Sequence, residues 1–227
     1  MKNIFVFLLI LSLTILIHGY NRYNRRTEWD YWGKGNTIYL DRHDVKCNKG
    51  ELLQGFTLSV PWEETINYEY DCLKYNYDGK DEEVLWVTDM VRSADDIFSE
   101  RTSADKLSKI PVKCKRENYA LREFKLETIC PGFPLNVCFI KYIFWCAPIQ
   151  TTRCSTGKTD WYDTQDGNIL ELSRIPIKLS NDNVLKGFQL NVEYYDRGFM
   201  EKKGKKFQYE YEFCEVSSSG SKLVELE

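Results

Sequence analysis

An internal repeat constrains the fold of this chain more than any other sequence feature. Trp29–Val60 aligns without a gap on Trp161–Val192, and eleven of the 32 aligned positions are identical. A third copy lies between them, because LSKIPVKC (Leu107–Cys114) matches LSRIPIKL (Leu172–Leu179), and the ALREFKL that follows parallels LLQGFTL and VLKGFQL. Copies that start about 65 residues apart indicate three supersecondary units, none of which can bury its apolar face alone.

Each copy closes with a segment in which aromatic or β-branched residues alternate with polar ones. These segments are INYEYDC (Ile66–Cys72), IKYIFWC (Ile140–Cys146) and FQYEYEFC (Phe207–Cys214). A period of two predicts half-buried strands. The middle segment is apolar on nearly both faces over Lys141–Trp145. We therefore expect its outer face to be covered, either by the chain itself or by a partner.

Three β-rich copies predict an all-β fold with pseudo-threefold symmetry. The two solutions are a β-prism of three antiparallel sheets and a β-trefoil, and the length of the unit favours the prism because trefoil units are shorter. The copies span about residues 29–72, 86–146 and 161–214, within a single three-repeat domain over residues 20–216.

Both ends of the chain lie outside this domain. Residues 1–19 have a basic start at Lys2, an apolar run from Ile4 to Ile17 and a terminal His18-Gly19, which is the layout of a secretory signal peptide. The alternative, a retained anchor, is disfavoured because the run falls short of the roughly 20 residues that span a bilayer. We expect a secreted protein, extracellular or stored in a secretory granule. The tail over residues 217–227 begins SSSGSK and is expected to be disordered.

The eight cysteines are even in number and follow a signal peptide, which implies disulfide bonds. Copies one and two each have one cysteine before the Gly-Phe or Glu-Phe strand and one at the end of the closing strand. In copy three Leu179 occupies the position of the first cysteine, and Cys214 lies one residue beyond the position of the second. In a regular strand this shift turns the Cys214 side chain to the opposite face, so Cys214 needs a different partner. The predicted bonds are Cys47–Cys72, Cys114–Cys146, Cys130–Cys138 and Cys154–Cys214.

Metal, cofactor and nucleic-acid functions find little support in the composition. The chain has no CxxC pair, and His43 is the one histidine outside the signal segment, so we expect neither a metal site nor a cofactor. Basic and acidic residues number 31 and 34, and the single basic cluster, over residues 201–206, is interpreted as a hairpin loop. Without a broad basic face, nucleic acid is not an expected partner. Stable membrane insertion is not expected either.

The repeat core resembles that of a known family. Cys47-x8-Phe56-x-Leu58-x-Val60, with Gly55 before the phenylalanine and a closing strand that ends in Cys72, is similar to the repeat of the vitelline membrane outer layer protein family. GFQLNVE in copy three matches it most closely. The resemblance implies a β-prism of three Greek-key sheets, a role in extracellular coats and a carbohydrate-related activity.

Candidates for catalysis are few. His43 is the one histidine base available to a nucleophile, and its counterparts in the other copies are Ile110 and Ile175, so we interpret it as structural or surface-exposed. Glycoside hydrolysis requires two carboxylates about 5–10 Å apart. No candidate catalytic group recurs between the copies or is brought together with another by the repeat. An enzyme is therefore not the favoured interpretation. The acidic residues considered are Asp41, Asp44, Glu63, Glu64 and Asp163.

Aromatic residues in loops suggest binding. Trp29 and Trp161 recur between copies and are predicted to be core residues, whereas Trp32, Trp62 and Tyr162 are unique to their copies and are the candidate binding residues. The first hypothesis is a structural or interaction protein of an extracellular coat, matrix or secretory granule, which packs against other extracellular proteins. The second is a lectin-like protein that binds glycans, and the third is a carbohydrate-active enzyme.

Overall fold

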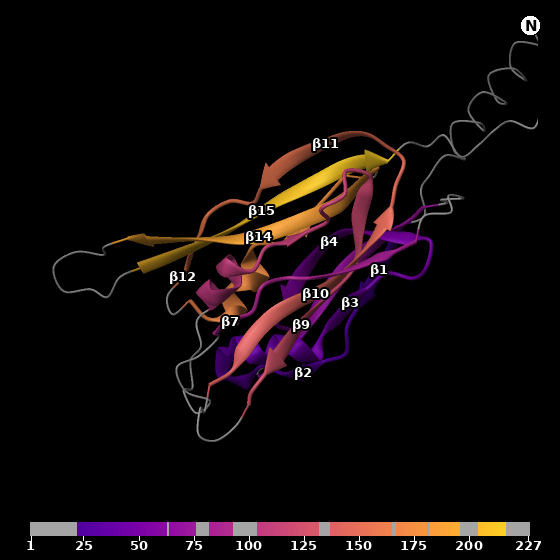
Figure 1. The fold of residues 1–227 in the computed structure, drawn as a ribbon. Helices are drawn as coiled ribbons and strands as arrows, with labels where there is room; N and C mark the ends of the chain where they lie inside the picture. Colours follow the sequence, from indigo (N-terminus) through magenta and orange to yellow (C-terminus); the bar gives the residue numbers. More distant parts are fainter. Residues whose placement is uncertain are drawn as a thin grey trace, which may run out of the picture.

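The computed structural model is an all-β molecule with three antiparallel sheets of five strands each (Figure 1). It describes residues 22–62, 64–75, 82–92, 104–131, 137–164, 167–180, 182–195 and 204–216. The predicted signal peptide, the predicted disordered tail and residues 201–203 of the basic cluster lie outside these residues. Residues 204–206 of that cluster, predicted to be in a hairpin loop, belong instead to strand β15 (Gly204–Val216). The three sheets form the pseudo-threefold β-prism that the repeat predicts, and not the alternative β-trefoil.

Each sheet is centred on the two long strands of one copy. Sheet one contains β1 (Arg22–Arg26), β5 (Thr65–Lys74), β4 (Glu51–Ser59) and β13 (Ile177–Lys178), with β2 (Asp30–Tyr31) also on β5. Sheet two contains β3 (Asp44–Lys46), β9 (Tyr119–Ile129), β10 (Phe139–Pro148) and β6 (Val84–Val87), with β7 (Val91–Arg92) on β10. Sheet three contains β11 (Thr151–Lys158), β15 (Gly204–Val216), β14 (Asn183–Tyr195) and β8 (Val112–Lys113), with β12 (Tyr162–Thr164) on β15.

The copies exchange short strands in a closed ring. Copy one donates β3 to sheet two, copy two donates β8 to sheet three, and copy three donates β13 back to sheet one. A 3-10 turn precedes each donated strand and lies against the receiving sheet. This exchange explains why one copy cannot fold alone. The turns are η2 (Thr37–Arg42), η3 (Ala104–Lys109) and η4 (Ile169–Arg174), and a further short turn, η1, spans Gly33–Gly35.

Three phenylalanines mark the pseudo-threefold axis. The ring centroids of Phe56, Phe124 and Phe188 lie 4.9, 4.8 and 5.0 Å apart, and all three rings are buried. These residues occupy the same position in the three copies. The repeat therefore places the same side chain at the same distance from the axis in each sheet. Contacts between inclined aromatic rings of this kind stabilise a fold by more than the burial of their apolar area alone.

The Gly-Phe motif of copies one and three has a packing reason. A Cβ atom on Gly55 would lie 2.2 Å from the carbonyl oxygen of Ile177, and one on Gly187 would lie 2.5 Å from that of Val112. Those carbonyls belong to the donated strands β13 and β8, so a glycine is needed where these two strands cross. Copy two has Glu123 instead, and its buried carboxylate accepts from Nζ of Lys46 at 3.1 Å.

A threonine repeated in all three copies fixes the turn between the first edge strand and the next. In copy one the Thr27 hydroxyl accepts from the amide of Tyr68 at 2.9 Å, and the Thr27 amide donates to the Tyr68 carbonyl at 2.9 Å. Thr88 and Thr159 make the same pair of bonds with the corresponding tyrosines of copies two and three. Two residues after each threonine the chain places an outward side chain, so this turn sets up the surface described below.

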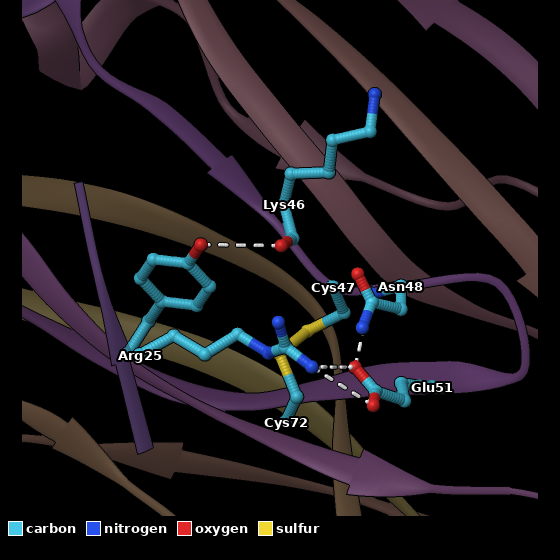
Figure 2. Close-up of polar contacts among 7 residues, drawn as sticks. Arg25, Lys46, Cys47, Asn48, Glu51 and Cys72 are labelled. Carbon is cyan, nitrogen blue, oxygen red and sulfur yellow. Dashed lines mark hydrogen bonds and ion pairs between the residues drawn. A yellow bond between two sulfur atoms is a disulfide. The ribbon is translucent and has the colours of Figure 1, made fainter. Parts of the chain in front are cut away.

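The four disulfides have the pairing that the repeat predicts. Cys47–Cys72 joins the end of β3 in sheet two to β5 in sheet one, beside the ion pair of Arg25 and Glu51 (Figure 2), whose Nη2 and Oε2 atoms are 2.8 Å apart. Cys114–Cys146 likewise joins sheets three and two. At the third seam, between sheets three and one, Leu179 and Phe213 occupy the positions of those cysteines and pack against the main core.

The apolar outer face of β10 is half-buried. Ile143 and Trp145 point outward beside Val87 and Leu85 of the edge strand β6, which are 49% and 52% exposed. The described part of the chain therefore covers this face only in part.

Candidate functional site

A hollow of about 490 Å³ opens at one edge of sheet three. Its lining comes from the end of β11 and the start of β12 (Lys158–Tyr162), from the segment that leads out of η4 into β13 (Arg174–Lys178), and from Tyr211 of β15. It thus spans the seam across which copy three passes its strand to sheet one. We call it the copy-three hollow.

Aromatic side chains form one part of its wall. Trp161 is 42% exposed, and Tyr162 is half-buried with the Arg174 guanidinium carbon 5.0 Å from its ring centroid. Tyr211 lies across β11, where a Cβ on Gly157 would meet its ring at 2.6 Å. Gly157 is therefore required for this ring to lie flat against the strand.

Charged groups form the other part. Lys158, Arg174 and Lys178 are exposed cations, and Asp160 is the one acidic side chain in the lining. Nζ of Lys158 lies 3.2 Å from Glu210, and Nε of Arg174 lies 3.7 Å from Glu171. Exposed pairs of this kind are weakly held, so both cations remain accessible to a ligand.

The three candidate binding residues do not meet in one site. Tyr162 lines the copy-three hollow, whereas Trp32 and Trp62 belong to copy one. Trp32 is half-buried against the core, and its amide donates to the carbonyl of Glu64 at 2.9 Å. Trp62 is 73% exposed in the turn between β4 and β5. Of the three, Tyr162 is the one that lines this hollow, and Trp32 packs against the core.

The prediction that Trp29 and Trp161 are core residues is wrong. They are 37% and 42% exposed, and Met90, at the same place in copy two, is 49% exposed. The repeated threonine turn holds all three outward at a sheet edge, so their recurrence reflects a shared turn and not shared burial. The pattern Thr-acid-Trp or Thr-acid-Met, at Thr27, Thr88 and Thr159, was the sequence signal for this surface.

Copy one has different chemistry at the same place. Asp30 occupies the position of Tyr162, and Arg42 that of Arg174, and their Oδ1 and Nη1 atoms are 2.7 Å apart. Partial burial disfavours the charged form of Asp30, but its hydrogen bonds to Arg42 and to the Tyr31 amide hold its pKa below the usual value. The arginine of copy one is therefore neutralised from within.

His43 is buried, with Nδ1 3.0 Å from the Thr27 hydroxyl. Burial lowers its pKa, so the ring is neutral near pH 7. Thr88 and Thr159 make the same turn in copies where the counterpart of His43 is an isoleucine, Ile110 or Ile175. His43 is therefore structural. Of the two acids that flank it, Asp44 is exposed, and burial raises the pKa of Asp41.

The carboxylates considered for hydrolysis do not converge. Asp163 is exposed on β12 of sheet three, Glu64 lies in the β4–β5 turn of sheet one, and Glu63 is outside the described residues. Beside the hollow, hydrogen bonds from Asn191 and Lys158 lower the pKa of Glu210. For Glu212 burial opposes ionisation, but bonds from Lys113 and Lys186 outweigh it, and its pKa is also lowered. Both groups are thus held ionised, unlike a general acid.

Comparisons with known proteins add no relative. No family model, curated protein or solved structure matches the chain, and the resemblance to the vitelline membrane outer layer family stays a prediction. Over the described ranges, no three histidine, cysteine or acidic side chains gather as metal ligands. In the same ranges no helix has the length and apolar character needed to cross a membrane.

Proposed function

We propose that the protein is secreted and binds glycans, in the manner of a lectin, through the copy-three hollow. The observation that carries the proposal is the exposed Trp161 beside Tyr162 in an open hollow with a charged and polar rim. Flat aromatic rings accept the apolar face of a sugar, while the polar rim can bond to its hydroxyls. Exposed aromatic residues of this kind gain burial when a ligand stacks on them.

The cysteines support the secreted part of the proposal. All eight are paired in disulfides, and none is free. Disulfides persist in oxidising compartments and are rare where thiols are kept reduced. Together with the predicted signal peptide over residues 1–19, this favours an extracellular or granule location.

A second candidate function rests on a different surface. Leu85 and Val87 are about half exposed on the edge strand β6, next to the half-buried Ile143 and Trp145. An apolar edge strand is a site where another chain can add or pack. This surface favours a component of an extracellular coat, matrix or secretory granule, with another extracellular protein as its partner. The two functions use separate faces and are compatible.

A glycan array probed with refolded protein lacking residues 1–19 tests the first function. We expect binding to at least one class of glycan. Trp161→Ala should weaken that binding about tenfold, the loss expected for one aromatic contact. Trp29→Ala is the matched control, because Trp29 follows the same turn in copy one and should leave binding unchanged. Silence across the array, or equal losses in the two variants, would contradict the proposal.

A further inference from the structure

We infer that the copy-three hollow selects sugars that carry a negative charge, as a carboxylate or a sulfate ester. This inference rests on the proposed glycan binding and concerns the class of sugar. The ring of such a sugar would lie against Trp161 and Tyr162, and its anionic group would meet Arg174 and Lys178.

The charge of the lining supports this choice. Three cations, Lys158, Arg174 and Lys178, and one acid, Asp160, line the described part of the hollow. Lys158 and Arg174 are paired with Glu210 and Glu171, at 3.2 and 3.7 Å, so the groups that face the hollow are mainly cationic while two partner carboxylates lie outside its lining. A locally positive hollow in an acidic protein attracts anions over the rest of the surface.

Arg174 is the group best placed to read the anion. Its side chain is 60% exposed, and its ion pair with Glu171 is long, at 3.7 Å, and uses Nε. Among the described residues, this is the one ion pair of Arg174. A guanidinium fork bonds a carboxylate or sulfate through two parallel hydrogen bonds. Because Arg174 also lies over the Tyr162 ring, it is held where an anion on a stacked sugar can reach it.

Copy one shows the neutralised form of the same position. There Asp30 replaces Tyr162, and its carboxylate binds Arg42 at 2.7 Å. In other words, a carboxylate is accommodated against this arginine when the chain supplies one. In copy three the chain supplies a tyrosine ring at that position. Arg174 keeps only the longer pair with Glu171, so it is more open to an external anion, and the ring adds a surface for stacking. Copy two has neither feature, since Val91 and Lys109 occupy these positions.

Matched pairs of glycans that differ in charge test the inference by isothermal titration. The first pair is oligogalacturonate and its fully methyl-esterified form, and the second is dextran sulfate and dextran. We expect at least one charged member to bind ten times or more tightly than its neutral form, and the preference to fall with added salt. Preference within the first pair alone identifies a carboxylate, and within the second alone a sulfate ester.

Two substitutions locate the effect. Arg174→Gln should bring the charged-to-neutral ratio close to one, and Tyr162→Asp should do the same by binding Arg174 as Asp30 binds Arg42. Arg174 is exposed, so its variant should fold even where Tyr162→Asp does not. Arg42→Gln is the control in copy one and should leave the ratio unchanged.

The outcomes separate the two proposals. Equal binding of charged and neutral forms would overturn the charge selection while the proposed glycan binding stands. If Arg42→Gln lowered the charged-to-neutral ratio as much as Arg174→Gln, the charge selection would also be overturned, because the anion would then not be bound in this hollow. Failure of every glycan here and on the array would overturn both.

Discussion

Copies one and three align without a gap, yet the equivalent seams between their sheets and the next are closed by different residues. In copy one a disulfide, Cys47–Cys72, joins two sheets, and Asp30 forms an ion pair with Arg42. In copy three the cysteine positions hold Leu179 and Phe213, and a tyrosine replaces the aspartate. The axis and the threonine turn are the same in both. The fold therefore depends on the shared axis and turns, whereas the residues that close the seam differ between the copies.

The disulfide of copy three serves a different element. Cys214 lies one residue beyond the seam position and is bonded to Cys154, which faces it on β11. Strand β11 ends at Lys158, and the turn that follows presents Trp161 to the hollow. The bond therefore anchors the edge strand that builds the candidate site. At the seam between sheets three and one, apolar packing of Leu179 and Phe213 stands where the other seams have a disulfide.

The largest expected effect comes from removing the seam disulfide of copy one. Cys47→Ala with Cys72→Ala should lower the free energy of unfolding by about 3–4 kcal/mol, because the bond closes a loop of 25 residues and both sulfurs are buried. Guanidinium unfolding measures the loss. Cys130→Ala with Cys138→Ala is the control, since its loop of eight residues should cost about 1 kcal/mol less. A larger loss of stability in the control would contradict the greater contribution assigned to the seam disulfide.

A smaller net effect is expected when the seam of copy three is converted to that of copy one. Leu179→Cys with Phe213→Cys should form a fifth disulfide, because the two positions match those of Cys47 and Cys72. The gain of about 3 kcal/mol from the bond is offset by a similar loss of apolar packing, so unfolding should change by roughly 1 kcal/mol or less. Peptide mapping without reduction detects the bond. Two free thiols would show that the seams are not equivalent.

The smallest effect concerns His43, where copy three has Ile175. Burial, aided by Arg42 and opposed by Asp30, lowers the folded-state pKa of His43, so the unfolded state binds the proton more readily. Stability is therefore retained above about pH 6.5 and falls as the pH drops through that value towards the folded pKa. His43→Ile should remove this part of the loss of stability at acid pH. Melting temperatures at pH 7.5 and 5.5 measure it, and equal drops in both proteins would contradict the assignment.

The sequence predicted the three-sheet fold and the disulfide pairs because a repeat places equivalent residues in equivalent surroundings. Leu179 in place of a cysteine was enough to redirect Cys214. The exchange of β3, β8 and β13 could not be predicted, because strands of two or three residues show no periodicity and their partners lie in another copy.

The candidate site was only partly predictable. Tyr162 was identified because it is unique to its copy, but Trp161 was assigned to the core because it recurs. Recurrence marks a shared position, and here that position is an exposed turn set by Thr159. The hollow itself joins two segments, residues 158–162 and 174–178, that meet only once copy three reaches across to sheet one. No local pattern reveals that meeting.

The central claim is that ligands bind in the hollow of copy three and not at its counterpart in copy one. The chain has six tryptophans, so the six indole N–H signals in a ¹⁵N-resolved NMR spectrum report on six places at once. On titration with the glycan that binds best, the signal of Trp161 should shift while those of Trp29 and Trp62 stay in place. A shift of Trp29 or Trp62 with Trp161 unmoved would contradict the account.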